Sequence, residues 1–389
     1  MSTSAAAVPS EARARRKPRL QWLATPWRVL FGVILTQGPV ICVLLLGYLY
    51  QLMRRQALRY WWRHAGERCE SFEGFLNADA TTREHVTLPN WFIAPERQRA
   101  EREDGTLRAL PRLLTASLWQ NLRKGVVALL TLWTVTLPGC ALMLFAWYDG
   151  WNNSFNKGYE NAPVGPLTGI LGLVLFSAAA AYVPMAQARH AACDEWRVFF
   201  DVRTNLKLLR SRVLAALVLT AGYLAASVPV TLIYTLPGFL PQMEFMSERY
   251  ATMSNAEALA YINGWYFWGG ALFVALLVML KRAGAHLYAG ALLRCVDRGA
   301  VRFESLSKFE RDVLARLGRP GVDASASTRQ SRGILVFLVL VLPWLVFTTE
   351  IFVAQFFSYH GGHGWLNQPL LQLPWMNYVP EALRELATP

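Results

Sequence analysis

The basic residues of this chain are sorted between its long apolar stretches. The segments that separate those stretches alternate between strongly basic and almost free of lysine and arginine. Under one alternating topology, all of the 39 lysines and arginines except Lys157, Arg249 and Arg384 fall on the same side. Loops rich in lysine and arginine stay on the cytoplasmic side of a membrane. The pattern therefore predicts a protein that crosses a membrane several times and has a strongly cationic cytoplasmic face.

Five apolar stretches have the roughly 20 residues that a spanning helix needs. Hydrophobic residues make up 54% of the chain and charged residues 17%, which excludes an ordinary soluble domain. The predicted fold class is an all-α integral membrane protein with five transmembrane helices, an N-terminal segment that re-enters or spans as a sixth helix, and cytoplasmic amphipathic helices. The five spans are expected at about 125–148, 164–185, 213–236, 264–280 and 333–357.

The first apolar stretch, within residues 29–64, breaks the alternation because basic residues flank it on both sides. A kinked sixth span would place the Arg-rich head outside, whereas a re-entrant hairpin would keep that head in the cytoplasm. Gln37-Gly38-Pro39 in the middle favours the hairpin, since proline cannot donate a backbone hydrogen bond. Each arm would then reach about halfway into the hydrocarbon core. Gln37 and Pro39 are candidate intramembrane functional residues for this reason.

The remaining segments complete the predicted organisation. We expect a disordered basic tail over residues 1–28, a charged cytoplasmic loop over 65–112, a helical membrane domain over 113–357 and an outer tail over 358–389. This topology places the N-terminus in the cytoplasm and the C-terminus outside. The expected location is the bacterial cytoplasmic (inner) membrane.

Several basic segments carry apolar residues at helical spacing, which is typical of helices that lie at a membrane surface. One covers residues 195–212, before the third span. Another covers 302–318, where Ser307 and Glu310 form a possible capping pair and Gly318 ends the helix. Anionic lipid headgroups are simpler partners for this charge than nucleic acid, for which no motif is visible. The residues predicted to contact lipid or the interface are Trp61, Trp62, Trp196, Phe199, Phe200, Arg203, Lys207 and Arg210.

Four motifs occur in a fixed order between residues 29 and 236. They are Gly47-Tyr48 with Arg54-Arg55, Leu88-Pro89-Asn90-Trp91, Val183-Pro184 with Ala186, Ala188, Arg189 and His190, and Phe199-Phe200-Asp201. In this order they resemble a family of uncharacterised multi-pass membrane proteins of bacteria and archaea. The charged insert after Trp91 departs from that family, whose loop is shorter. The resemblance implies a topology and implies no activity.

One carboxylate, Glu350, lies within a predicted span. Acidic groups inside membranes are costly and often bind cations or carry protons, so Glu350 is a candidate functional residue. It also follows Thr348-Thr349 near the outer end of the span, where access to water is the alternative explanation.

Other polar patterns are weaker. His360 and His363 flank two glycines and could hold a metal, but no carboxylate or cysteine nearby in the sequence completes a zinc set. His190 and Asp194 are four residues apart and would pair in a catalytic site, or simply decorate a charged helix end. No nucleotide-binding, hydrolase or zinc-protease motif is present. We therefore expect no cofactor.

These features favour a non-catalytic membrane protein. It would be a subunit or organiser of a membrane assembly, with a protein partner or as a homo-oligomer, and would bind anionic lipid on its cytoplasmic face. The reasons are the many interfacial aromatic and basic residues and the lack of a visible buried polar pathway. A transporter for a small or amphiphilic solute is the alternative, indicated by Glu350 and the prolines within spans. A lipid-modifying membrane enzyme is the third hypothesis.

Overall fold

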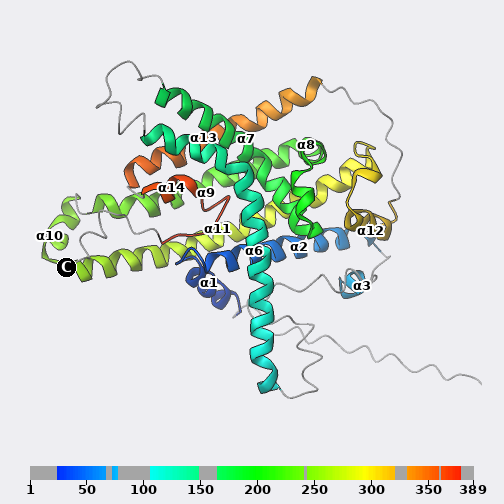
Figure 1. Ribbon diagram of the computed structural model, residues 1–389. Helices are drawn as coiled ribbons and strands as arrows, with labels where there is room; N and C mark the ends of the chain where they lie inside the picture. Colours follow the sequence, from blue (N-terminus) through cyan, green and yellow to red (C-terminus); the bar gives the residue numbers. More distant parts are fainter. Residues whose placement is uncertain are drawn as a thin grey trace, which may run out of the picture.

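Helices account for all the regular secondary structure that the computed structural model describes (Figure 1). The described residues are 24–66, 72–77, 106–148, 164–240, 243–319, 331–358 and 361–377. In chain order the elements are α1 (Ala24–Leu35), α2 (Cys42–Arg63), α3 (Phe72–Asn77), α6 (Thr106–Phe145), α7 (Val164–Cys193), η4 (Trp196–Phe200), α8 (Val202–Ser211), α9 (Val213–Phe239), α10 (Glu244–Thr252), α11 (Asn255–Asp297), η6 (Phe303–Ser305), α12 (Lys308–Arg316), α13 (Ser331–Ser358) and α14 (Gly361–Leu366).

Within this described part, five helices are long and apolar enough to cross a membrane. The qualifying stretches lie in α6, α7, α9, α11 and α13 and coincide with the five predicted spans. They are Leu118–Tyr148, Val164–Cys193, Val213–Phe239, Asn255–Asp297 and Leu338–Gln355. The prediction of an all-α, multi-pass membrane protein is thereby confirmed.

The N-terminal apolar segment is a hairpin of two helices that lies along α11. In α1, Gly32 lies against Val274 and Val33 lies near Gly270, so α1 runs antiparallel to α11. In α2, Gln56 lies opposite His286 and Trp61 donates to the carbonyl of Ala289, so α2 runs parallel to α11.

The turn of this hairpin lies beside Gly270, within the apolar stretch of α11. Helix α1 has 12 residues, or about 18 Å of helical rise. The chain therefore runs along α11 toward Gly270 and reverses, so α1 and α2 form a helical hairpin rather than one kinked helix. Gln37, in the turn, donates from Nε2 to the Val33 carbonyl, and Pro39 is exposed.

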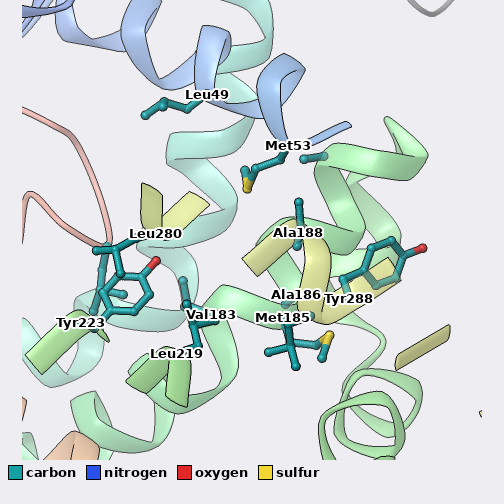
Figure 2. Packing of buried hydrophobic residues seen from close by; sticks show 14 of the residues in the cluster. Leu49, Met53, Val183, Met185, Ala186, Ala188, Leu219, Tyr223, Leu280 and Tyr288 are labelled. Carbon is teal, nitrogen blue, oxygen red and sulfur yellow. The ribbon is translucent and has the colours of Figure 1, made fainter. Parts of the chain in front are cut away.

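Helix α7 is the centre of the bundle and packs against α2, α6, α11 and α13. Its C-terminal half is rich in alanine, and every residue from Ala179 to Cys193 is buried. Small side chains let neighbouring helices approach closely. Figure 2 shows Ala186 and Ala188 of α7 surrounded by larger residues from other helices, among them Met53, Leu219 and Tyr288.

The segment 367–377 is irregular, yet it is largely buried within the bundle. Gln372 donates from Nε2 to Thr136 Oγ1 at 2.6 Å, and Tyr234 donates its hydroxyl to the Trp375 carbonyl at 2.7 Å. The backbone N–H of Met376 donates to the carbonyl of Thr36 at the hairpin turn (2.9 Å). Part of the sequence expected to be an outer tail therefore packs within the bundle, where the Tyr234 hydroxyl and the Thr36 carbonyl satisfy two of its backbone groups.

The segment 195–212 is two elements rather than one amphipathic helix. The 3-10 helix η4 ends at Asp201, and the Asp201 carboxylate then accepts from the backbone of Thr204 (3.2 Å) as the N-cap of α8. The break turns Phe199 into the core, where its side chain is fully buried. In contrast, the capping pair predicted at Ser307 and Glu310 is present at the start of α12, and Gly318 follows that helix with a positive φ of 64°.

Candidate functional site

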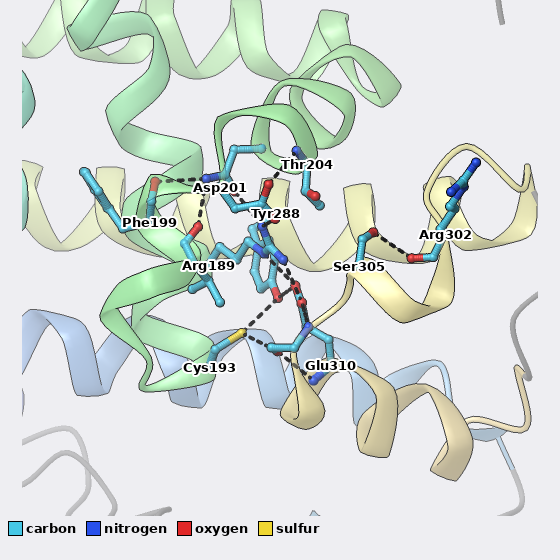
Figure 3. Close-up of polar contacts among 12 residues, drawn as sticks. Arg189, Cys193, Phe199, Asp201, Thr204, Tyr288, Arg302, Ser305 and Glu310 are labelled. Carbon is cyan, nitrogen blue, oxygen red and sulfur yellow. Dashed lines mark hydrogen bonds and ion pairs between the residues drawn. The ribbon is translucent and has the colours of Figure 1, made fainter.

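Arg189, near the C-terminal end of α7, is the centre of a buried polar cluster (Figure 3). Its Nε and Nη2 donate to the two carboxylate oxygens of Glu310, at 2.9 and 3.0 Å. Its Nη1 donates to Asp201 at 2.9 Å and to Asn205 at 3.3 Å. Tyr288 donates its hydroxyl to Glu310 at 2.7 Å. The cluster ties α7, α8, α11 and α12 together, and its carboxylates are occupied by these bonds.

Asp194, the residue that directly follows α7, forms a second ionic group. Its carboxylate lies 3.0 Å from Lys124 Nζ and 3.1 Å from Arg54 Nη1, which come from α6 and α2. Burial opposes ionisation of this carboxyl, but Lys124 and Arg54 outweigh it and hold its pKa below the usual value. Asp194 also has a left-handed backbone (φ 58°), a conformation in which aspartate and asparagine are enriched.

The residues of the catalytic hypothesis do not converge. Asp194 bonds Lys124 and Arg54, whereas Asp201 bonds Arg189 and caps α8. His190 is buried, and its Nδ1 has no hydrogen-bond partner within the described residues. This arrangement gives no nucleophile, base and orienting group in one place, so the geometry does not support the lipid-modifying enzyme.

An apolar groove of about 510 Å³ opens between α9 and α11. Its walls are aliphatic and partly exposed, with Val218 on one side and Met279 on the other. One end of the groove is polar, where Arg212 and His286 line it. Ligand cavities of this volume accept small amphiphilic molecules.

Further arginines surround that polar end. Arg63 and Arg282 are charged neighbours of His286, and Arg59 is in turn a charged neighbour of both arginines. No carboxylate lies within ion-pair distance of these three arginines among the described residues. Like charges gathered without an acidic partner repel one another, and an anion relieves that repulsion.

The residues predicted at the lipid interface have diverse positions. Trp61 and Phe199 are fully buried and pack in the core, while Trp62 is half-buried near Phe72. Trp196 and Phe200 are exposed and contact each other edge to face, at 6.0 Å between ring centroids. On α8, Arg203 and Lys207 are exposed and Arg210 is half-buried, so these side chains remain candidates for lipid contact.

Glu350 is a residue of α13, and its side chain points toward α9. Ser227 donates its hydroxyl to one carboxylate oxygen at 2.7 Å, and Thr231 donates to the other at 3.4 Å. Both hydroxyls come from α9 and line a small cavity together with Asn367, Gln368 and Leu370 of the C-terminal segment. The structure therefore places Glu350 next to hydroxyl groups that line a small cavity of mixed polar and apolar character.

The histidine pair gains no support as a metal site. His363, in α14, is exposed, and His360 lies outside the described residues. Among the described residues, no group of three or more histidine, cysteine, aspartate or glutamate side chains could hold a metal ion.

Lys281 of α11 is a site residue that the sequence did not reveal. Its side chain is 2% exposed, and Nζ donates to Gln187 Oε1 at 2.6 Å and to the carbonyl of Leu370 at 3.3 Å. A lysine followed by an arginine at the end of an apolar stretch indicates an interfacial anchor. Its burial depends on tertiary packing, because Gln187 of α7, Tyr223 of α9 and the segment 367–377 all contact it.

Comparison with known proteins gives no relative on which to base an assignment. No protein family model, no curated protein and no solved structure matches this chain.

Proposed function

We propose that this protein binds an anionic phospholipid in the groove between α9 and α11, as a non-catalytic subunit or organiser of a bacterial inner-membrane assembly. The observation that carries the proposal is the pairing of an aliphatic groove with a cluster of cations at one end. An acyl chain fits the walls at Val218 and Met279. The headgroup phosphate fits Arg212, His286 and Arg282.

The distribution of basic residues between the two sides of the membrane supports a binding site for an anionic lipid. The cationic end of the groove lies at the start of α9 and in the second half of α11, next to the segments that the positive-inside rule assigns to the cytoplasm. Cytoplasmic leaflets carry anionic lipids, and each lysine or arginine near the surface contributes about 1 kcal/mol of attraction to them. The proposed lipid is therefore bound from the inner leaflet.

Native mass spectrometry of the purified protein, with phosphatidylglycerol and phosphatidylcholine added in equal amounts, tests the proposal. We expect the wild-type protein to retain phosphatidylglycerol preferentially. Arg282→Gln should weaken that binding about five-fold, the equivalent of about 1 kcal/mol. Arg249→Gln, on α10 near the opposite end of α11, is the matched control and should leave the preference unchanged.

A second pair of variants tests the groove itself. Ala225 lines the groove, whereas Val228 is exposed on the same helix outside it. Ala225→Phe should exclude the acyl chain and reduce lipid retention, and Val228→Phe should not. Equal retention of the two lipids by the wild-type protein, or equal behaviour of the two phenylalanine variants, would refute the proposal.

A further inference from the structure

Two non-helical segments meet within the bundle, and one of them also contacts Lys281. One is the hairpin turn after α1, and the other is the C-terminal segment 367–377, whose Met376 N–H donates to Thr36. Irregular backbone at membrane depth is tolerated where it is buried in protein or lines a polar site. Lys281 bonds this C-terminal segment directly, through the Leu370 carbonyl.

The partners of Lys281 are all neutral. They are Gln187 from α7, Leu370 from the C-terminal segment and, at 3.5 Å, the hydroxyl of Tyr223 from α9. No carboxylate bonds Lys281 among the described residues. A buried ammonium without a counter-ion is costly, and the neutral amine removes that cost. The site therefore suits a lysine that gains and loses a proton.

Polar groups continue from Lys281 toward the cationic end of the molecule. The Tyr50 hydroxyl is a neighbour of Gln187, and the Tyr50 ring lies 5.0 Å from the His190 ring. His190 is one helical turn from Asp194, whose side chain is 35% exposed. Among the residues that the structure describes, Tyr50 Oη, Gln187 Nε2 and His190 Nδ1 are buried and have no partner in hydrogen-bond geometry. Such unsatisfied groups are rare in folded proteins, and three in a row mark a place that water or a moving proton can use.

The opposite side of Lys281 leads to Glu350. Leu370, which accepts from Lys281, also lines the small cavity that contains the hydroxyls of Ser227 and Thr231. Those two hydroxyls bond Glu350. The cavity, of about 30 Å³, can hold one or two waters. Titratable groups thus occur at intervals from Asp194 to Glu350, with Lys281 between them.

We propose that Lys281 is an intramembrane proton acceptor, at the middle of a path formed by Asp194, His190, Tyr50, Gln187, Lys281, Leu370 and Glu350. In the forward step, the nitrogen lone pair of neutral Lys281 takes a proton from a protonated water on the Asp194 side, so an O–H bond of that water breaks as a new N–H bond forms. In the return step, that N–H bond breaks and the proton passes through water in the small cavity to the Glu350 carboxylate, which restores the amine. The protein would conduct protons or couple their movement to a transported solute. This activity is separate from lipid binding and does not rest on it.

Selective ¹⁵N-lysine NMR of the protein in lipid nanodiscs measures the central step. The chain has few lysines, and Lys281→Met identifies the Nζ signal of Lys281. We expect this signal to change between its ammonium and amine positions within the range from pH 5 to pH 9, while that of exposed Lys207 stays ammonium. A Lys281 signal that stays in one form across the whole range overturns the proposal.

Proteoliposomes that enclose a pH-sensitive dye measure the path. After a pH gradient is imposed with valinomycin and potassium present, wild-type vesicles should equilibrate at least ten-fold faster than Lys281→Met vesicles. Lys207→Met is the control and should match the wild type.

If Lys281→Met does not fold, Gln187→Leu interrupts the path while keeping the lysine, and the same loss is expected. Equal rates for wild-type and protein-free vesicles, or for wild type and a folded path variant, contradict the proposal. Phosphatidylglycerol retention by Lys281→Met and Gln187→Leu should be unchanged, which separates this test from that of the groove.

Discussion

At the scale of single residues, the Arg189–Glu310 pair is the most consequential ionic contact. Arg189 is 1% exposed and Glu310 is completely buried, and the two share a bidentate contact. Removing one member of a buried pair leaves the other charge uncompensated, at a cost of about 3–5 kcal/mol. Arg189→Met should therefore destabilise the protein by about that amount, as measured by thermal unfolding in detergent.

Two further variants test whether the loss of stability comes from breaking the Arg189–Glu310 pair rather than from removing any arginine. Arg203→Met, at an exposed arginine of α8, should change stability by less than about 0.5 kcal/mol. The double variant Arg189→Met with Glu310→Leu should recover part of the loss, because no charge is then left unpaired at this contact. A single variant as stable as the wild type would show that the cluster does not hold α12 in place.

Asp194 and Asp201 predict how stability responds to acid. Burial opposes ionisation of Asp201, but hydrogen bonds from Thr204 and Arg189 outweigh it, so its pKa is lowered like that of Asp194. An unfolded aspartate titrates near about pH 3.9. The unfolded chain thus binds these protons first, and the stabilisation is complete above about pH 3.9 and is lost as the pH falls through the lower folded values.

The unfolding midpoint, followed by tryptophan fluorescence from pH 7 to pH 3, checks this response. Asp194→Asn keeps a residue that tolerates the left-handed backbone but removes the charge. We expect this variant to be less stable at pH 7 and to lose less of its remaining stability below about pH 4. Identical pH profiles for the variant and the wild type would rule out a contribution from Asp194.

At the scale of elements, the crossing of α2 and α6 depends on glycine. A Cβ at Gly47 would overlap the carbonyl oxygen of Asn121, and a Cβ at Gly125 would overlap that of Val43. Either alanine forces the two helices apart and also strains the bond from Gln51 to Asn121 (2.5 Å). Gly47→Ala should cost about 1–3 kcal/mol of stability or more.

Gly264 provides the control for that variant, because nothing lies within 4 Å of a Cβ at this position of α11. Gly264→Ala should be neutral or slightly stabilising, since alanine favours a helix over glycine. Thermal unfolding of both variants in the same detergent makes the comparison. Equal destabilisation by the two would mean that the close helix crossing is not what makes Gly47 necessary.

The elements also show what sequence patterns could and could not predict. The length of the apolar stretches predicted all five long helices. It did not predict that α7 and α11 continue well past their expected ends at 185 and 280. Those extensions carry Arg189 and Lys281, whose polarity is satisfied by distant residues such as Glu310 and Leu370. Glu350 was found because a lone acid in an apolar stretch is visible locally. The proposed polar path and the groove could not be predicted from the sequence, because each depends on contacts between separate helices.

At the scale of the whole molecule, the predicted orientation can be tested directly. Lys207 and Arg249 are both exposed, and the charge pattern assigns them to opposite sides of the membrane. In intact cells, a membrane-impermeant maleimide should label Arg249→Cys and should label Lys207→Cys only after permeabilisation. A background with Cys69→Ser is suitable, because Cys42, Cys140, Cys193 and Cys295 are buried. The reverse labelling pattern would invert the topology and place the cationic end of the groove outside.

The bond between Met376 and Thr36 joins residues that a ribosome adds far apart in time. Membrane helices are inserted while the chain is still being made, so the amino-terminal hairpin enters the bilayer long before its carboxy-terminal neighbour exists. Its turn can make this contact only after α13 and the segment that follows it have emerged. Docking of the turn is therefore a late step of assembly, although the hairpin itself is synthesised early.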